Sequence, residues 1–370
     1  MNIIDLYEKY FDDDYKKVFE QFSNYDVYLV GGPVRDMLLK RSFDDIDITF
    51  NGNATELAKK INCEILSVHE DFGTVKIKIN NKIIDLASTR KESYPQKGHL
   101  PVVTEIGCSL RDDVLRRDFS VNSLAMSLNK KTFAEVIDYT GGLNDLKTKT
   151  LRILHSKSFV DDPSRILRGF KYSSRLGFSY DEETLNLQKH YLSSINYDMS
   201  YKRILQEFYK TEWSIEVFND FINQNIYKLI NPEVKNDFDF WFSTKNPFIY
   251  FALLLPDNRF ELNKKDRSII EKVKEFKEEP KNDFETYKTF NKEPLEFVQI
   301  LSIMKKSSAK IYLQRLKDIK ILTTGKDLIN MGFEPSKSFQ EIFDFLISKK
   351  LKNPNMTKED ELKLISSILF

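Results

Sequence analysis

The segment YLVGGPVRDMLLKRSFDDIDITF, residues 28–50, carries the clearest structural pattern of the chain. The apolar run at its start predicts a buried strand, the glycines Gly31 and Gly32 let the backbone turn close to a ligand, and a helix is predicted from Pro33. The N–H groups at such a helix start attract phosphate. Arg35, in the first helical turn, could add a fork of donors to phosphate oxygens. The stretch therefore predicts a phosphate-binding strand–turn–helix unit.

Two carboxylates, Asp45 and Asp47, follow in the same stretch. If a strand runs through them with Ile46 and Ile48 buried, its period of two places both carboxylates on one face. Carboxylate oxygens are the ligands that Mg²⁺ prefers, and two ions roughly 3.5–4 Å apart can hold the attacking and leaving oxygens of a phosphoryl or nucleotidyl displacement. Either motif alone is more often a plain turn or solvated surface. Together they indicate chemistry on a nucleoside triphosphate.

A third carboxylate, Asp85, lies in the predicted strand KIIDLAST after an Asn-Asn turn. It faces the same way as Ile83 and Ala87. The pattern leaves two interpretations open. Asp85 is either a third metal ligand or a charge that keeps an edge strand from pairing.

The segment RRDFSVNSLAMSL, residues 116–128, combines apolar and polar positions. Phe119, Leu124 and Met126 are predicted core residues, whereas Arg117, Asp118 and Asn122 form the polar set. The alternative to a binding role is a salt-bridged helix start.

The segment DDPSRILRGFKYSSRLGF, residues 161–178, predicts a helix on which Asp162, Arg165 and Arg168 recur every three residues as one polar stripe. A carboxylate accepts hydrogen bonds and a guanidinium donates them. Cytosine and adenine both present an amino donor beside a ring-nitrogen acceptor, and uracil and guanine reverse that order. The stripe could therefore select C or A without a nucleic-acid template, because a mismatch leaves polar groups unpaired. In the competing interpretation Asp162 caps a helix that begins with Pro163, and both arginines are solvated.

These motifs resemble the signatures of the tRNA nucleotidyltransferase and poly(A) polymerase family of the bacterial, second class. The family patterns are matched in order: GGxVRD at 31–36, DxD at 45–47, RRDFxxN at 116–122, DxxGGxxDL at 138–146, EDPxRxLRxxRFxxRLGF at 161–178, and RxxxE at 203–207. Two of the departures from them matter. Asp161 replaces a glutamate, and Lys171 replaces an arginine and cannot donate a bidentate fork.

The resemblance implies an α+β fold, in which a nucleotidyltransferase α/β head with a mixed sheet and helices is followed by an all-α neck, body and tail. It implies Mg²⁺-dependent transfer of CMP and AMP from CTP and ATP to the tRNA 3′ end, with release of pyrophosphate. Asp45 and Asp47 would bind the metal ions, and the resemblance favours a catalytic role for Asp85. The nucleotide-binding residues would be Gly31, Gly32, Arg35, Arg117, Asp118, Asn122, Asp162, Arg165, Arg168 and Lys171.

The loop before the RRDF motif bears on which nucleotides such an enzyme would add. CCA-adding relatives often carry an E-x-Y-x-D-x-R-x-P loop before RRDF, and this chain has Glu92 and Tyr94 but no following Asp or Arg. It looks more like relatives that divide the work into CC-adding and A-adding enzymes. A poly(A) polymerase of the same family and a non-catalytic RNA-binding homologue are two rival interpretations.

The chain has 370 residues and a formal net charge of +1, so binding of RNA would depend on local basic patches rather than on a global field. The candidate patches are 202–210 and 304–320. Short β-rich runs dominate before residue 150 and helical periodicity after it. We expect a catalytic head at 1–150, a neck with base recognition at 151–212, a body at 213–280 and a tRNA-binding tail at 281–370.

The two cysteines, Cys63 and Cys108, lie far apart and have no metal-ligand spacing, which indicates neither a disulfide framework nor a zinc site. The segment MNIIDLYEKYFDDDYKK lacks the features of a signal peptide, and the apolar run PFIYFALLLP is too short to cross a bilayer. We therefore expect a cytoplasmic protein without a membrane partner. The sequence does not indicate an oligomeric state.

Overall fold

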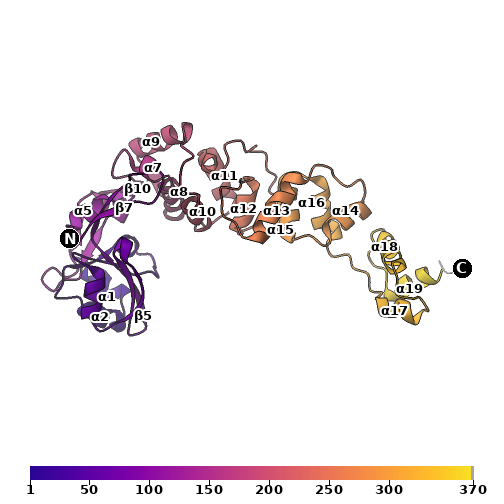
Figure 1. The fold of residues 1–370 in the computed structure, drawn as a ribbon, viewed down its shortest axis with the longest axis horizontal. Helices are drawn as coiled ribbons and strands as arrows, with labels where there is room; N and C mark the ends of the chain where they lie inside the picture. Colours follow the sequence, from indigo (N-terminus) through magenta and orange to yellow (C-terminus); the bar gives the residue numbers. More distant parts are fainter. Residues whose placement is uncertain (368–370) are drawn as a thin grey trace. The chain divides into compact units, whose positions relative to one another are not determined.

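The computed structural model describes residues 1–367, which divide into two compact units. Unit 1 contains residues 1–212 and 223–229, and unit 2 contains residues 213–222 and the residues from 230 on. Figure 1 shows the order of their elements along the chain. The expected division into head, neck, body and tail is finer than these two units and stays a prediction.

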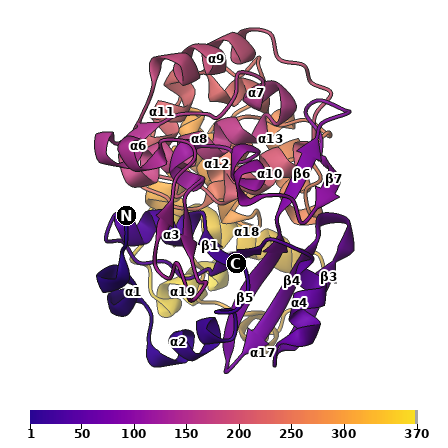
Figure 2. The same ribbon diagram turned by 90° about the vertical axis from the view of Figure 1, so that its left-hand side faces the viewer.

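Unit 1 is built on a mixed sheet of seven strands in the order β3-β4-β5-β2-β1-β8-β9. Its strands are β1 (Val27–Val30), β2 (Asp47–Phe50), β3 (Glu64–His69), β4 (Thr74–Ile79), β5 (Lys82–Ser88), β8 (Ala125–Ser127) and β9 (Val136–Ile137). Only β2 and β5 are parallel neighbours, and the other pairs are antiparallel. Figure 2 faces this unit and shows β3, β4 and β5 side by side. The mixed sheet confirms the expected fold class.

Sequence explains several connections of this sheet. Asn80 and Asn81 both have positive φ values, 47° and 65°, as the tight hairpin turn between β4 and β5 requires. Alternate residues of β4 are buried, among them Val75 and Ile77. The helix α4 (Ala54–Lys60) packs against this part of the sheet.

The remaining helices of unit 1 are α1 (Ile4–Tyr10), α2 (Asp13–Glu20), α3 (Gly32–Leu38), α5 (Leu110–Leu115), α6 (Gly142–Thr148), α7 (Ser158–Asp161), α8 (Ser164–Leu176), α9 (Glu182–Ser193) and α10 (Tyr201–Tyr209). A separate hairpin joins β6 (Arg90–Ser93) to β7 (Val102–Ile106). The helices α8 and α10 pack against each other. They carry the motifs that the sequence placed in the neck.

The neck is not purely helical, which corrects one expectation. Gly177 takes a left-handed conformation with φ of 70° and ends α8, and the chain then returns as β11 (Ser179–Tyr180). This strand pairs in parallel with β10 (Thr150–Leu151). A glycine stop followed by a short extended segment explains the strand, which is too short to show a period of two.

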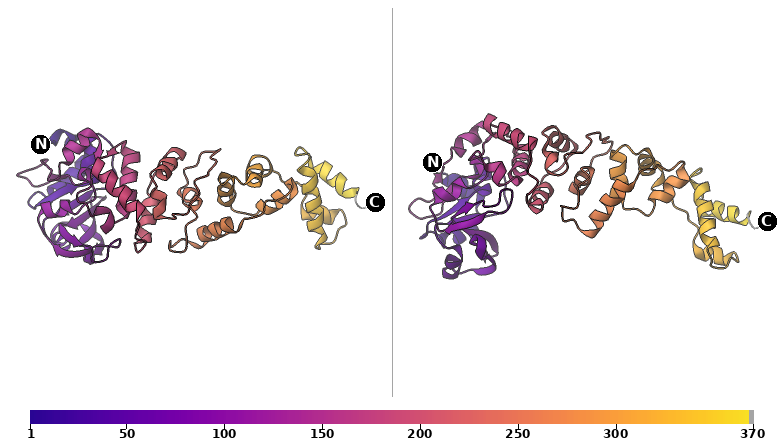
Figure 3. Two further views of the ribbon diagram at one scale, coloured as in Figure 1. Left: turned by 90° about the horizontal axis from the view of Figure 1, so that it is seen from above. Right: turned by 45° about the horizontal axis from the view of Figure 1, so that its top comes forward.

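Among its described residues, unit 2 contains helices and no strands, as the two views of Figure 3 show. They are α11 (Ile215–Asn223), whose last residue belongs to unit 1, α12 (Pro247–Leu253), α13 (Lys264–Glu275), α14 (Asp283–Phe290), α15 (Leu295–Ile303), α16 (Ser307–Ile311), α17 (Gly325–Asn330), α18 (Ser338–Lys350) and α19 (Lys358–Ser366). The last three helices share a core of their own around Leu328, Leu346 and Ile365. Along residues 1–367, no helix has the length and apolar character needed to cross a membrane.

Candidate active site

The turn between β1 and α3 forms one wall of a cleft in unit 1. Gly31 has a φ of 70°, and Pro33 lies in the first turn of α3. A side chain at Gly31 would be strained, and its Cβ would lie 3.4 Å from Nη1 of Arg117. The turn therefore lets a ligand approach the backbone beside the Arg117 guanidinium.

Arg35 lies in the same cleft wall, but most of its donors face protein atoms. Its Nε and Nη2 each donate to a carboxylate oxygen of Asp36 at 2.8 Å, and its Nη1 donates to Oδ1 of Asn122. The side chain is only 3% exposed. Three of its five donors are thus occupied, and Arg35 does not present the free fork that the sequence suggested.

Asp45 and Asp47 both line the cleft, and Ile46 between them is buried. The strand β2 begins at Asp47, so Asp45 lies just before it. The backbone N–H of Asp85 donates to the carbonyl of Ile46 at 3.0 Å and extends the ladder by one residue. This extended backbone directs the two carboxylates to the same side, as the period of two predicted.

The pKa of Asp47 is raised above its ordinary value. Although solvent reaches this side chain, the cleft walls remove part of its hydration, and this is the largest cause. Arg117 opposes the shift, whereas the carboxylates of Asp85 and Asp45 add to it. Negative groups that repel one another are the arrangement that a divalent cation relieves.

Asp85 takes a different place from the other two acids. Its Cα pairs with that of Asp47 across the parallel strands β2 and β5, but its side chain does not line the cleft. Its Oδ1 lies 3.4 Å from Nζ of Lys76 on the next strand. Within residues 1–367 no group of three His, Cys, Asp or Glu side chains is arranged to hold a metal ion. The site thus offers two carboxylates, and a metal role of Asp85 stays a prediction.

Arg117 is held from behind by an acid that sequence reasoning missed. Asp113 is fully buried, and its carboxylate accepts from Nη2 of Arg117 at 2.9 Å and from Nη2 of Arg116 at 2.7 Å. Burial raises the pKa of Asp113, but the two guanidinium groups more than offset this and lower it. Nε of Arg117 is buried and has no hydrogen-bond partner. Arg117 is therefore fixed next to the glycine turn with a donor unused.

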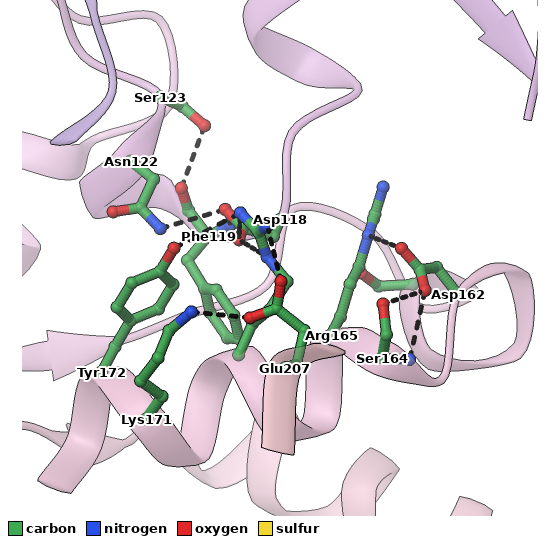
Figure 4. Close-up of polar contacts among 12 residues, drawn as sticks. Asp118, Phe119, Asn122, Ser123, Asp162, Ser164, Arg165, Lys171, Tyr172 and Glu207 are labelled. Atoms are coloured by element: carbon green, nitrogen blue, oxygen red, sulfur yellow. Dashed lines mark hydrogen bonds and ion pairs between the residues drawn. The ribbon is translucent and has the colours of Figure 1, made fainter. Parts of the chain in front are cut away.

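Asp118 joins two elements of the cleft (Figure 4). Its carboxylate accepts from Nδ2 of Asn122 at 3.1 Å and from Nε of Arg168 at 2.7 Å. Burial alone would raise the pKa of Asp118, but the charge of Arg168 and the hydrogen bond from Asn122 lower it to about 2. The three polar residues predicted from RRDFxxN thus lie together, and Asp118 orients Arg168.

We expect the Asp118–Arg168 pair to stabilise the fold above about pH 4 and to lose this effect as the pH falls toward 2. The pKa of Asp118 is lowered to about 2 in the folded protein, and an unfolded Asp has a pKa of about 3.9. The difference corresponds to about 2–3 kcal/mol of stability at neutral pH. Urea unfolding followed by circular dichroism should show Asp118→Asn far less stable than wild type at pH 7 and the gap narrowed at pH 3. An equal gap at both pH values would contradict this linkage.

Asp162 and Arg165 are brought together at the start of α8, but both are buried and paired with protein groups. Asp162 accepts from the backbone and hydroxyl of Ser164 and forms an ion pair with Arg203. Nη1 of Arg165 donates to the Ser158 hydroxyl at 2.8 Å. Nη2 of Arg165 donates to the carbonyl of Arg116 at 2.9 Å and to the hydroxyl of Tyr94 at 3.1 Å.

This geometry modifies both sequence interpretations of the stripe. Arg165 is 4% exposed, so it is not solvated as the capping interpretation required. Asp162 does accept from the N–H of Ser164 at 3.1 Å, as a helix-capping acid would. Both side chains line the cleft, so a base can reach them only by exchange with their present partners.

The RxxxE motif, on α10, supports α8. Arg203 pairs with Asp162, and Oε2 of Glu207 accepts from Nζ of Lys171 at 2.6 Å (Figure 4). Burial and, to a smaller degree, Arg168 lower the pKa of Lys171, although Glu207 opposes this. Lys171 thus pairs with Glu207 and is not free for a ligand. A lysine at this position also cannot donate the bidentate pair of hydrogen bonds that an arginine would.

The cleft that these residues line has a volume of about 920 Å³. Ten lysines and arginines line it, against seven aspartates and glutamates. The chain as a whole is nearly neutral, with a net charge of +1, so positive charge is concentrated here. A cleft of this kind attracts a polyphosphate.

Three residues of the cleft or its support were missed as site residues. Asp36 accepts from Nη2 of Arg175 at 3.1 Å in addition to holding Arg35. Asp113 could have been found, because it lies three and four residues before two arginines, the spacing of neighbours on a helical surface. Tyr172 gave no signal, since an aromatic residue at helical spacing usually belongs to the core.

Several known proteins are similar to this chain in sequence and in fold. Residues 27–152 match the model of the poly A polymerase head domain. An A-adding tRNA nucleotidyltransferase of Aquifex aeolicus is 43% identical over 165 residues, which are 44% of this chain and 20% of that protein. One of Halalkalibacterium halodurans is 28% identical over 98% of this chain and 94% of that protein. The Thermotoga maritima CCA-adding enzyme complexed with tRNA has the same fold, with a TM-score of 0.78 and 23% identity over 100% of this chain and 99% of that chain.

The fold is the one that CCA-adding enzymes have. In sequence the chain is similar to the tRNA nucleotidyltransferase and poly(A) polymerase family, as its motifs indicated. This family is metal-dependent. The cleft fits that chemistry, because Asp45 and Asp47 line it together with the turn at Gly31 and Gly32, and because the acidic neighbours of Asp47 contribute to its raised pKa. One or two carboxylates together with substrate phosphates are a common way to hold Mg²⁺.

Proposed function

We propose that the protein transfers CMP, AMP or both from CTP and ATP to the 3′ end of a tRNA and releases pyrophosphate. One observation carries this proposal: Asp45 and Asp47 line the same positively charged cleft as the glycine turn and Arg117. The family relationship supports it, and the curated relatives carry the same activity in their names. The tRNA-bound state of the Thermotoga neighbour supports tRNA as the acceptor.

The chain's own residues would do most of the work by positioning. The triphosphate would lie against the turn at Gly31 and Gly32, beside Nη1 of Arg117. Asp45 and Asp47 would hold Mg²⁺. The bound ions would lower the pKa of the primer 3′-hydroxyl and neutralise the departing pyrophosphate. The Asp118–Arg168 pair would hold the ribose side of the nucleotide.

Asp162 and Arg165 would read the base. Their present partners, Ser164, Arg203 and Ser158, keep them fixed when no nucleotide is bound. A cytosine or adenine that offers a donor to Asp162 and an acceptor to Arg165 could replace some of these contacts. A uracil or guanine would leave two buried groups unpaired, at a cost of about 1–3 kcal/mol for each.

We therefore expect Asp162→Asn to raise the use of UTP or GTP relative to CTP or ATP by about 10- to 100-fold, because an amide replaces an acceptor with a donor. Single-nucleotide incorporation into a tRNA primer, with each triphosphate alone, measures this. Asp161→Asn is the matched control, since Asp161 is the neighbouring acid and does not line the cleft. An unchanged ranking of the four nucleotides in Asp162→Asn would reject the base-reading role.

A narrower candidate is an enzyme that adds only the terminal A. Two observations favour it: the Aquifex and Halalkalibacterium relatives are both named A-adding, and the loop after Glu92 lacks the Asp and Arg found in many CCA-adding relatives. Primers that end before the first C, after the second C and after the A distinguish the possibilities. Addition of A to the second primer, with no addition of C to the first, would establish the narrower activity.

The same assay also tests for a poly(A) polymerase and for a non-catalytic homologue. A poly(A) polymerase would add many A residues to RNA that is not tRNA, and a non-catalytic homologue would release no pyrophosphate.

We also propose that the protein works in the reducing cytoplasm, because Cys63 and Cys108 are both free thiols in the structure.

A further inference from the structure

Tyr172 lies on α8 at a point where three of the cleft's motifs meet. Its ring centroid is 5.1 Å from Cζ of Arg35, 5.9 Å from Cζ of Arg168 and 5.3 Å from Nζ of Lys171. Its edge also meets the ring of Phe119 at 6.0 Å in a T-shaped contact. One aromatic ring thus contacts three cations that come from two different elements.

The hydroxyl of Tyr172 adds a second kind of contact. Nη2 of Arg168 donates to it at 3.3 Å, while Nε of the same guanidinium donates to Asp118 at 2.7 Å. Burial raises the pKa of Tyr172, although Arg168 opposes this, so the hydroxyl is neutral at working pH. It can therefore accept from Arg168 without adding a charge.

We infer that Tyr172 is a positioning residue for the incoming nucleotide: its hydroxyl sets the orientation of Arg168 and its ring holds Arg35. This inference rests on the proposed function. Arg35 belongs to the glycine-turn side of the cleft and Arg168 to the base-reading helix. A single side chain therefore joins the glycine turn, where the triphosphate would lie, to Arg168, which would hold the ribose side of the nucleotide.

Tyr172→Phe tests the hydroxyl, because it keeps the ring and removes one oxygen. We expect the KM for the nucleotide to rise about fivefold with kcat within twofold, as the loss of one hydrogen bond of about 1 kcal/mol predicts. The thermal midpoint should fall by no more than about 2–4 °C. A purely structural role would lower the midpoint in the same way but leave KM as it is, and this result would overturn the inference.

A matched control is Tyr287→Phe in unit 2. The hydroxyl of Tyr287 donates to the carbonyl of Ile319 at 3.1 Å, so this variant also loses one tyrosine hydrogen bond. We expect it to leave the KM for the nucleotide unchanged. An equal rise in KM in both variants would show that the effect of Tyr172→Phe is not local.

A further measurement separates action through Arg168 from direct contact with the nucleotide. In a double-mutant cycle with Arg168→Lys, the effects of the two changes on KM should not add, because one acts through the other. Additive effects would overturn the positioning role.

The outcome is distinct from a failure of the proposed function. If the wild-type protein incorporates no nucleotide into any RNA primer, the proposed function fails. In that case nucleotide binding by wild type and Tyr172→Phe, measured by calorimetry with ATP, still tests the inference, and equal affinities would reject it.

Discussion

Asp47→Asn is expected to reduce nucleotide incorporation by about 1,000-fold and to leave the fold equally stable or more stable at neutral pH. The loss follows from removal of one of two carboxylates that would hold Mg²⁺, an interaction worth several kcal/mol in the transition state. Primer extension and release of pyrophosphate measure it.

The expected gain in stability follows from the pKa of Asp47, which is raised by partial burial and by the carboxylates of Asp85 and Asp45, against the opposing effect of Arg117. A raised pKa means that the charged carboxylate is less favourable in the folded protein than in the unfolded chain. The neutral asparagine removes this penalty at pH 7. The difference in thermal midpoint between variant and wild type should vanish below about pH 4, where the carboxyl group takes up a proton in both states.

A neighbouring acid provides the control, and another provides a second test. Asp44→Asn alters the carboxylate next to Asp45 in the same cleft, and we expect incorporation to stay near the wild-type rate. Asp45→Ala should abolish incorporation with the fold intact. Appreciable activity of either Asp45→Ala or Asp47→Asn in saturating magnesium would refute the metal role. Asp85→Asn then decides between a third ligand, which would give a similar loss, and a charge next to Lys76, which would not.

The local architecture of the site was predictable from the sequence because it depends on short-range chemistry. The run before Gly31 has the composition of a buried strand, the glycine itself allows the positive φ of 70°, and Pro33 suits a first helical turn. The burial of Ile46 and Ile48 confirms the alternation that places Asp45 and Asp47 together. Each of these features is encoded within a few residues.

The partners of the charged residues were not predictable in the same way. Lys171 and Glu207 are 36 residues apart, and Asp162 and Arg203 are 41 apart, so their pairing depends on how α8 packs on α10. A helical pattern tells which side chains share a face, but it does not tell whether that face meets solvent, substrate or another helix. For this reason the exposed, ready stripe suggested by the sequence differs from the buried network that the structure has.

The largest effect on stability is expected in the core that α17, α18 and α19 share. Glu361 is fully buried, and its carboxylate accepts from the backbone N–H of Leu322 at 2.8 Å, from the N–H of Thr323 at 2.7 Å and from the hydroxyl of Thr323 at 2.8 Å. It also accepts from Nζ of Lys350 at 2.6 Å, and Lys350 in turn donates to the carbonyl of Met356 at 2.9 Å. One carboxylate thus ties α19 to α18 and to the segment that precedes α17.

We expect Glu361→Ala to destabilise the small core of α17, α18 and α19 by about 3–5 kcal/mol, because it leaves the ammonium of Lys350 buried without its counter-ion. Hydrogen exchange resolved by segment should show amides of α18 and α19 exchanging on the order of 100- to 1,000-fold faster, with the strands β1 and β2 unchanged. Tryptophan fluorescence would not report this opening, since the chain's two tryptophans, Trp213 and Trp241, lie outside these three helices.

The cause of that loss can be separated from the simple removal of a side chain. Asp360→Asn changes the neighbouring acid, which is exposed and accepts from the N–H of Thr357 at 2.9 Å, and we expect a much smaller effect on exchange. The double variant Lys350→Met with Glu361→Met removes both charges and should recover part of the stability lost in Glu361→Ala, because neither charge is left buried alone. If the double variant opens as readily as Glu361→Ala, the unpaired ammonium is not the cause, and the hydrogen bonds to Leu322 and Thr323 are.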